Sequence, residues 1–145
     1  MTNGALVVVW GQAVRGREQH ALEVFNEVLA FYGRLQRAGE IDSFEPVALE
    51  PSGGTLAGFL IARGDAAQLQ RIRLSDEFLR LSNRSLHVVD NFGVHGAYLG
   101  DDLQRLYANW GAQAQALTSS LAGAAGGAGS LTEGPCEDAS RACWR

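Results

Sequence analysis

The sequence contains no lysine, and its twelve basic residues, all of them arginines, are outnumbered by sixteen acidic ones. Binding to a phosphate backbone requires a concentrated basic surface, and a net charge of -4 without a basic cluster does not supply one. No apolar run approaches the roughly 20 residues that a membrane-spanning helix needs. We therefore expect neither a nucleic-acid partner nor a membrane partner.

Cysteine is almost absent, since the chain has only Cys136 and Cys143. They form neither a CxxC pair nor a Cys/His cluster with the spacing of a zinc site, so no metal is expected. No phosphate loop, nucleotide fingerprint or G-x-S-x-G elbow is present, and we predict no cofactor. The first residues lack the charged start and small-residue cleavage site of a secretion signal. These absences predict a cytoplasmic protein with free thiols.

What is present is the composition of a globular domain. The 145 residues are 46% hydrophobic and 19% charged, which suits one domain with its own core. From about residue 122 onward the chain becomes rich in glycine, alanine and serine, and such a stretch buries too little surface to offset its ordering entropy. We predict a folded domain over residues 1–121 and a flexible tail over 122–145.

Hydrophobic periodicity predicts alternating strands and helices within that domain. Runs of β-branched and apolar residues indicate strands at 5–14, 43–50, 55–64 and within 87–100. Three- and four-residue steps indicate helices at 17–38, from 65 onward with a break near Ser75, and from 101 onward. Gly39 is predicted to end the first helix and Asp65 to begin the second. Pro46 places its strand at a sheet edge.

This β-α-β-β-α-β order is the ferredoxin-like pattern, an α+β fold with the first and third strands at the centre of an antiparallel sheet. Two helices cover one face of such a sheet, and the other face is normally polar. Here the central strands, "ALVVVW" and "LAGFLIA", are apolar on both faces. We expect a second copy of the chain to cover the other face, giving a homodimer through the sheet. A monomer whose last helix folds back is the alternative.

Over residues 4–100 the chain resembles the dimeric α/β-barrel superfamily in element order, compact hairpin and two-faced central strands. "VVDNFGVHGAYLG" is similar to the Asp-Pro-Phe segment before the last strand of YCII-like members, with Asn91 at the proline position. The resemblance implies pairing of two ferredoxin-like sheets. The superfamily includes cofactor-independent monooxygenases, haem-degrading enzymes, isomerases and ligand-binding domains, so the resemblance implies no single activity.

His95 is the leading candidate for a catalytic residue. It lies on the last predicted strand among Gly93, Gly96 and Ala97, whose small side chains leave room for a ligand. A neutral imidazole in such a place can act as a general base near neutral pH. The alternative is a half-buried histidine that is hydrogen-bonded to a backbone carbonyl.

Three residues are candidates for binding a ligand beside His95. Trp10 lies near the end of the first strand and is predicted either to line a pocket or to pack in the dimer core. Arg63 ends the third strand, where it can clamp an anionic group or form a salt bridge at the rim. Tyr98 follows His95 on the last strand and completes the predicted set.

Two further groups of side chains are weaker candidates for a site. His20, Glu23 and Glu27 share a helix face at metal-ligand spacing, but an ordinary solvated face has the same pattern. His87 and Asp90 lie three residues apart at a helix-to-strand transition, where they form either an acid–base dyad or a simple turn cap.

Two classes of function follow from these candidates. The first is a protein that binds a small hydrophobic or aromatic molecule between sheet and helices, and that acts as an enzyme if His95 lies at the polar end of the pocket. The second is a non-catalytic binding or assembly module that acts through its dimer surface and tail. A buried cavity reached by His95 favours the first class, and a filled interior favours the second.

Overall fold

The computed structural model describes residues 2–125, and the chain falls into two compact units, 1–107 and 108–145. The strands are β1 (Gly4–Trp10), β2 (Ser43–Ala48), β3 (Gly58–Gly64) and β4 (Gly93–Tyr98). The helices are α1 (Glu18–Arg37), α2 (Ala66–Arg73), α3 (Asp76–Leu86) and α4 (Gly100–Ala125). Helix α4 thus continues beyond the domain boundary predicted at residue 121. The rest of the predicted tail, from residue 126, lies outside the described residues.

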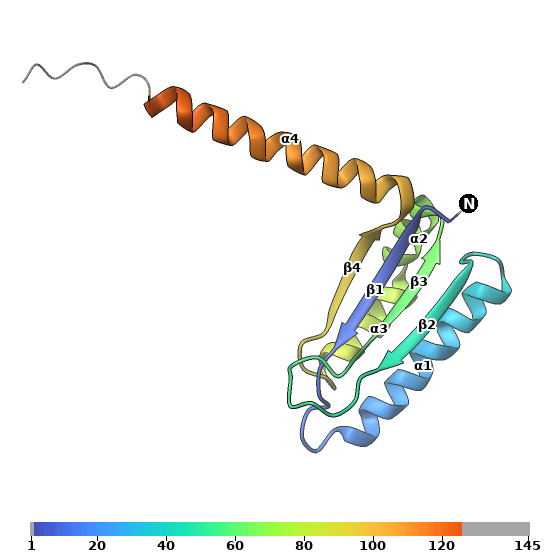
Figure 1. Cartoon of the computed structure of the whole chain (residues 1–145). Coiled ribbons are helices and arrows are strands. Elements are labelled where there is room, and N and C mark those ends of the chain that lie inside the picture. Colours follow the sequence, from blue (N-terminus) through green and yellow to red (C-terminus); the bar gives the residue numbers. More distant parts are fainter. Residues whose placement is uncertain (1, 126–145) are drawn as a thin grey trace, which may run out of the picture. The chain divides into compact units, whose positions relative to one another are not determined.

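The four strands form one antiparallel sheet in the order β2-β3-β1-β4 (Figure 1). This arrangement confirms the predicted α+β, ferredoxin-like topology with β1 and β3 at the centre. Strand β2 lies at an edge, as Pro46 requires, because proline has no N–H to donate to a second neighbouring strand.

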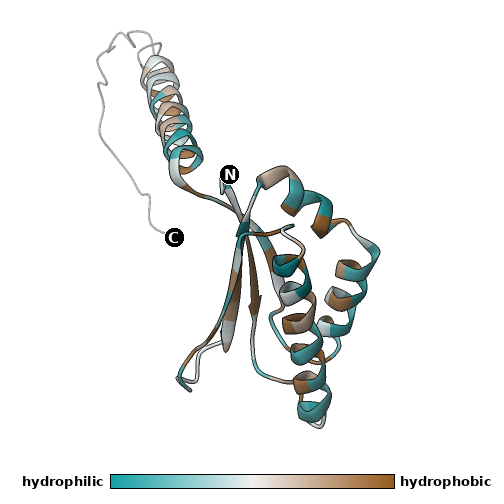
Figure 2. Cartoon of the chain, turned by 90° about the vertical axis from the view of Figure 1, so that its right-hand side faces the viewer, coloured by the Kyte–Doolittle hydropathy of each residue, from teal (hydrophilic) through white to brown (hydrophobic). Residues whose placement is uncertain are grey.

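Helices α1, α2 and α3 cover one face of the sheet (Figure 2). Leu6 and Val8 of β1 and Leu60 and Ala62 of β3 point toward these helices and form the centre of the core. Because side chains alternate along a strand, the residues between them point to the opposite face. We call this second face, which α1, α2 and α3 leave uncovered, the open face.

The open face is apolar at its centre. Val7 and Val9 of β1 lie opposite Ile61 and Phe59 of β3, and all four are half-buried. The prediction that both faces of the central strands are apolar is therefore correct.

The helix ends follow the predicted local signals. Asp65 accepts a hydrogen bond from Gln68 N at 3.0 Å and begins α2, and Ser75 accepts one from Phe78 N at 3.3 Å and begins α3. After α1 the chain turns at Gly39, whose φ of 73° is one that glycine adopts without strain. The break near Ser75 therefore separates two helices, α2 and α3, which together fill the place of the second predicted helix.

Helix α4 confirms the helix that was predicted from residue 101. Leu103, Leu106 and Tyr107 lie on it at three- and four-residue steps and are exposed within the first unit. Within residues 2–125 no helix is both long and apolar enough to cross a membrane.

Candidate functional site

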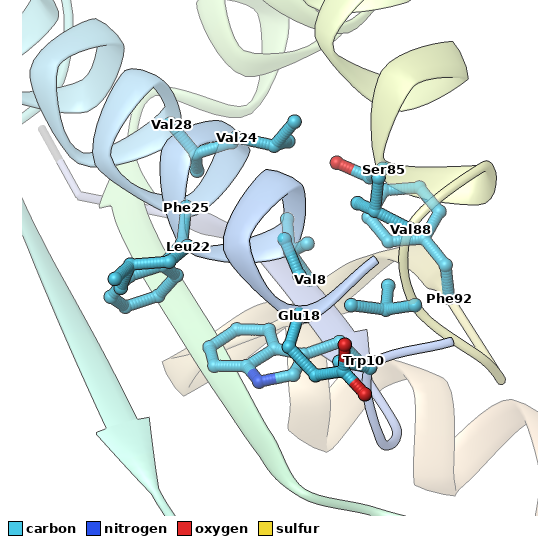
Figure 3. Close-up of a pocket in the computed structure, with 13 residues that line it drawn as sticks. Val8, Trp10, Glu18, Leu22, Val24, Phe25, Val28, Ser85, Val88 and Phe92 are labelled. Atoms are coloured by element: carbon cyan, nitrogen blue, oxygen red, sulfur yellow. The ribbon is translucent and has the colours of Figure 1, made fainter. Parts of the chain in front are cut away.

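A cavity of about 300 Å³ lies between the sheet and the helices, beside the N-terminal half of α1 (Figure 3). We call it the outer cavity. Apart from Glu18 and Ser85, the side chains that line it are apolar or aromatic. They are Val8, Trp10, Ala13, Ala21, Leu22, Val24, Phe25, Val28, Val88, Val89 and Phe92.

The two halves of α1 have different neighbours, and this difference leaves space for the cavity. Phe31 and Tyr32, in the C-terminal half, are buried in the core and contact each other edge to face, with ring centroids 5.3 Å apart. The N-terminal half instead faces the end of α3 and the connection to β4. There Val88 and Phe92 stand across from Val24, and the gap between these walls is the outer cavity (Figure 3).

Trp10 lies at one side of the outer cavity, where its ring contacts Phe25 at a centroid distance of 5.6 Å. The indole lies over Gly58 of β3, the residue paired with Trp10 in the sheet. A Cβ atom at position 58 would come within 2.6 Å of the ring, so the glycine permits this orientation. Trp10 is therefore placed in the predicted type of pocket, between sheet and helices.

Glu18, the first residue of α1, is the one charged side chain among the lining residues of the outer cavity. Its carboxylate is exposed and accepts a hydrogen bond from the Gly16 N–H at 3.1 Å. Hydrogen bonds from the backbone of Glu18 and Gly16 lower the pKa of this carboxyl group. The rim of the outer cavity therefore carries a negative charge at neutral pH.

A second, smaller cavity of about 20 Å³ adjoins the first. We call it the inner cavity. Val8, Val28, Ser85 and Phe92 line both cavities, and the inner one is also bounded by Phe31, Tyr32, Phe78, Leu81 and Ser82. The two cavities therefore share part of their lining.

A polar groove shares Val24 and Val88 with the outer cavity. It is lined by two arginines and two histidines, Arg17, His20, Arg84 and His87. The Arg84 guanidinium forms a salt bridge with Glu27 at 3.0 Å, so Glu27 is paired with a cation rather than grouped with His20. Within the described residues there is no cluster of three or more histidine, cysteine or acidic side chains suited to a metal.

His95 does not line the outer cavity, although we expected it to border a pocket between sheet and helices. It pairs with Val7 in the sheet and shares the open face with it, while Val94 beside it packs against the core. The ring is exposed, and it occupies the space that a side chain on Gly93 would fill, since a Cβ there would lie 2.8 Å from His95 Nε2. The acid–base role of His95 stays a prediction, and this placement separates it from the cavity.

Arg63 and Tyr98 also lie away from the outer cavity. Arg63 is on the open face, where its Nη1 atom lies 3.8 Å from the Glu45 carboxylate, a weak salt bridge at the rim. Tyr98 is exposed at the end of β4, in a separate groove that also contains Gly96 and Asp102. Of the four predicted site residues, only Trp10 therefore lines the cavity.

Glu18, Val88 and Phe92 line the outer cavity but are not among the site residues predicted from the sequence. The apolar stripe of α1 was detectable, but periodicity does not distinguish a residue that packs in a core from one that lines a cavity. Phe92 precedes β4 in the segment that contains His95, and an alternation count from Val94 would have placed His95 on the opposite face from the core.

No known protein family matches the sequence, and no curated protein sequence matches it. Solved structures do match. A dimeric protein of unknown function and ferredoxin-like fold from Bacteroides fragilis is 11% identical, with a TM-score of 0.50 over 66% of this chain and 96% of that one. The fold is ferredoxin-like.

Two further solved structures that match this chain carry different names. An ethyl tert-butyl ether d (ethd) family protein from Bacillus halodurans has a TM-score of 0.53 at 10% identity, over 69% of this chain and all of that one. The hydroxynitrile lyase from Passiflora edulis has a TM-score of 0.51 at 13% identity, over 68% of this chain and 94% of that one. At such low identities the likeness establishes the ferredoxin-like fold and no activity.

Asn91 gives a physical reason for one departure from the YCII-like pattern. Its φ is 52°, in the left-handed region that asparagine tolerates. Proline, which holds φ near −65°, could not adopt this conformation. The turn that leads into β4 therefore differs from the turn that an Asp-Pro-Phe sequence would form.

Proposed function

We propose that this protein binds a small, mainly apolar or aromatic molecule in the outer cavity, and that it works as a homodimer paired through the open face of its sheet. The observation that carries the proposal is the outer cavity itself. Its volume of about 300 Å³ falls at the lower end of the range for ligand pockets, and its walls are almost entirely apolar.

The charge at the rim narrows the class of ligand. The Glu18 carboxylate repels anions from its side of the outer cavity and favours a neutral or cationic molecule there. Trp10 and Phe25 offer aromatic faces at the same end, and such faces suit a flat hydrocarbon ring. A compact bicyclic hydrocarbon is therefore a suitable first probe.

We propose that the protein binds this molecule without catalysing a reaction on it in the outer cavity. The candidate acid–base residue, His95, lies on the open face and not beside the bound molecule. The fold does not select between enzyme and binding protein, because one similar structure is named a hydroxynitrile lyase and another a protein of unknown function. A role for His95 would have to be exercised at the open face.

The dimer part of the proposal rests on the apolar centre of the open face. Val7, Val9, Phe59 and Ile61 form a continuous patch on two neighbouring central strands. A second copy offers the same patch, and stacking two such sheets removes both patches from water.

Calorimetric titration with indane tests the ligand part of the proposal. The wild type should bind this bicyclic hydrocarbon, and the variant Ala21→Phe should bind it at least about tenfold more weakly, because the added ring fills the outer cavity. The matched control is Ala30→Phe, an exposed position on the same helix, which should bind like the wild type. Both variants are first compared by thermal melting. Equal binding by the two folded variants, or no binding by the wild type, would contradict the proposal.

A further inference from the structure

Helix α4 carries a regular apolar stripe along its length. Its members recur at alternating four- and three-residue steps, and they are Leu103, Tyr107, Trp110, Ala114, Leu117 and Leu121. We call these residues the α4 stripe. The large side chains from Tyr107 to Leu121 are between 60% and 72% exposed. Large apolar side chains gathered on one exposed face mark a surface that another molecule covers.

The core of the sheet and helices does not account for the α4 stripe. Among the described residues, the core cluster and the side chains packed against it extend only as far as Val94, whereas α4 begins at Gly100. The stripe therefore calls for a partner of its own.

The spacing of the α4 stripe indicates the kind of partner. Alternating four- and three-residue steps form the narrow seam along which two helices wrap around each other. A helix that packs on a sheet or a globular core instead presents a wider apolar face. From residue 108 onward the stripe is flanked by small or polar residues, namely Gly111, Gln113, Thr118 and Ser120. The stripe therefore fits a second helix better than it fits the open face of a sheet.

The charges of α4 favour a second copy of the same helix. Its charged residues, Asp101, Asp102 and Arg105, all lie near its N-terminus, and residues 106–125 carry no charge. Binding to an anionic membrane surface requires a basic polar face, which this helix does not have. A highly charged partner helix would find no opposite charge along most of α4. Another α4 brings the same uncharged seam.

Side-chain size favours an antiparallel pair over a parallel one. In a parallel pair Trp110 would meet the partner's Trp110, and Ala114 would meet the partner's Ala114, so a crowded layer would lie beside an empty one. In an antiparallel pair centred on Ala112, Trp110 meets the partner's Ala114 instead. Large residues then face small ones, which is how packed layers fill space.

The same antiparallel register matches the rest of the α4 stripe. Tyr107 meets the partner's Leu117, and Leu103 meets the partner's Leu121, so every member of the stripe has an opposite number. The acidic N-terminal turns, with Asp101 and Asp102, lie at opposite ends of the pair, whereas a parallel pair would bring them together. Antiparallel helix dipoles also attract each other.

We propose that the α4 helices of the two chains of the homodimer pair in an antiparallel manner through the α4 stripe, centred on Ala112. This inference rests on the dimer of the proposed function and adds a second contact to it. The stripe alone is too small to hold two chains together, because it offers roughly 500 Å² per chain against the roughly 800 Å² of a stable interface. Pairing of the sheets tethers the two helices and raises their effective concentration to about the millimolar range.

Double electron–electron resonance, which measures the distance between two spin labels, tests this pairing in the full-length dimer. Cys136 and Cys143 are replaced by serine, and one label per chain is attached at Ala112→Cys or at Ser119→Cys, both on the face of α4 opposite the stripe. Labels at 112 lie at the same height and should be about 20 Å apart, the width of two helices. Labels at 119 are displaced by a further 21 Å or about that along the helices, so they should be about 30 Å apart.

Two matched variants labelled at position 112 test the role of the α4 stripe. Trp110→Asp places a charge in the stripe, so the distance peak should be lost. Its mass in light scattering should remain that of a dimer, because the sheets still pair. The control Gln115→Asp adds the same charge on the exposed side away from the stripe and should keep the peak near about 20 Å. Thermal melting first checks that both variants are folded.

The outcomes separate this inference from the proposed function. Equal distances at 112 and 119 would mean a parallel pair and would overturn the antiparallel register. A dimer without a defined distance at either position, or a peak that survives Trp110→Asp, would overturn the contact through the α4 stripe and leave the sheet dimer standing. A wild type that is a monomer would contradict both the proposed dimer and the pairing of α4.

Discussion

At the scale of single residues, the position of Trp10 depends on a side chain that is missing. Gly58 lies directly opposite Trp10 in the sheet, and the indole occupies the space above it. A Cβ atom at position 58 would approach both the ring and the Val47 carbonyl oxygen to 2.6 Å. The wall of the outer cavity is therefore determined by the register of β1 on β3 as much as by the tryptophan.

The variant Gly58→Ala tests this dependence. It should lower the free energy of unfolding by about 1–3 kcal/mol, because the new methyl group must displace either the ring or the backbone of β2. Denaturant unfolding measures the change. The matched control is Gly96→Ala on β4, where a Cβ meets nothing within 4 Å and the stability should stay the same or rise slightly. Equal effects at the two positions would show that the close approach at Gly58 is unimportant.

A second residue-scale prediction concerns the ionisation of Tyr32. Because burial raises its folded-state pKa, the stability that the neutral phenol contributes is present below pH 10 and is lost as the pH rises above that value. In an ultraviolet titration of the folded protein, Tyr32 should contribute no absorbance change until the protein unfolds in alkali. The variant Tyr32→Phe should therefore give the same absorbance change as the wild type until alkaline unfolding. A smaller change in the variant would mean that Tyr32 is accessible.

At the scale of secondary-structure elements, the local signals in the sequence were sufficient to predict where the helices begin and end. Asp65, Ser75 and Gly39 act on backbone groups within a few residues of themselves, so their effects do not depend on the rest of the fold. The strand order followed from the element order and from Pro46. Fold and helix boundaries were therefore largely predictable from the sequence.

The site was less predictable because it depends on contacts between distant segments. The outer cavity exists where the N-terminal half of α1 faces Val88 and Phe92, which lie far away in the sequence. The small neighbours of His95 suggested space for a ligand, but the space over Gly93 is occupied by the ring of His95 itself. Trp10 is the predicted site residue that lines the outer cavity, and its role in binding a ligand stays a prediction.

The cap of α3 provides an element-scale prediction. Ser75 accepts a hydrogen bond from Phe78 N, and its hydroxyl donates to the Ile72 carbonyl oxygen at 2.7 Å. The variant Ser75→Ala should therefore destabilise the protein by about 1 kcal/mol in denaturant unfolding. Ser75→Thr restores the hydroxyl group and should recover most of the loss. If threonine is no better than alanine, the side chain does not cap the helix.

At the scale of the whole molecule, the two faces of the sheet differ in what covers them. The helix-covered face contains Val8 and Leu60 and forms the core. The open face carries an apolar patch around Phe59 and Ile61 that α1, α2 and α3 leave uncovered. Substitutions on the open face should therefore disrupt the dimer, whereas substitutions on the helix-covered face of the same strands should unfold the chain.

Light scattering, which measures molecular mass, tests these two predictions. The wild type should have about twice the mass of one chain at micromolar concentration. Phe59→Asp should give a folded monomer, because a carboxylate in the apolar patch opposes pairing of two sheets. Val8→Asp should instead unfold the chain, because it places a charge in the core. The control Leu79→Asp alters an exposed apolar residue on α3 and should leave the dimer intact. A wild type that is a stable monomer would contradict the proposed pairing.

The most direct test of the ligand pocket is a set of intermolecular NOEs between indane and the valine methyl groups of the protein. Val8 and Val28 line both cavities, whereas Val7 and Val9 lie on the open face and serve as an internal control on neighbouring positions of β1. A bound indane should show NOEs to the methyl groups of Val8 and Val28 and none to those of Val7 and Val9. NOEs confined to Val7 and Val9, or none to any valine at saturating indane, would contradict the claim that the cavity beneath α1 is the binding site.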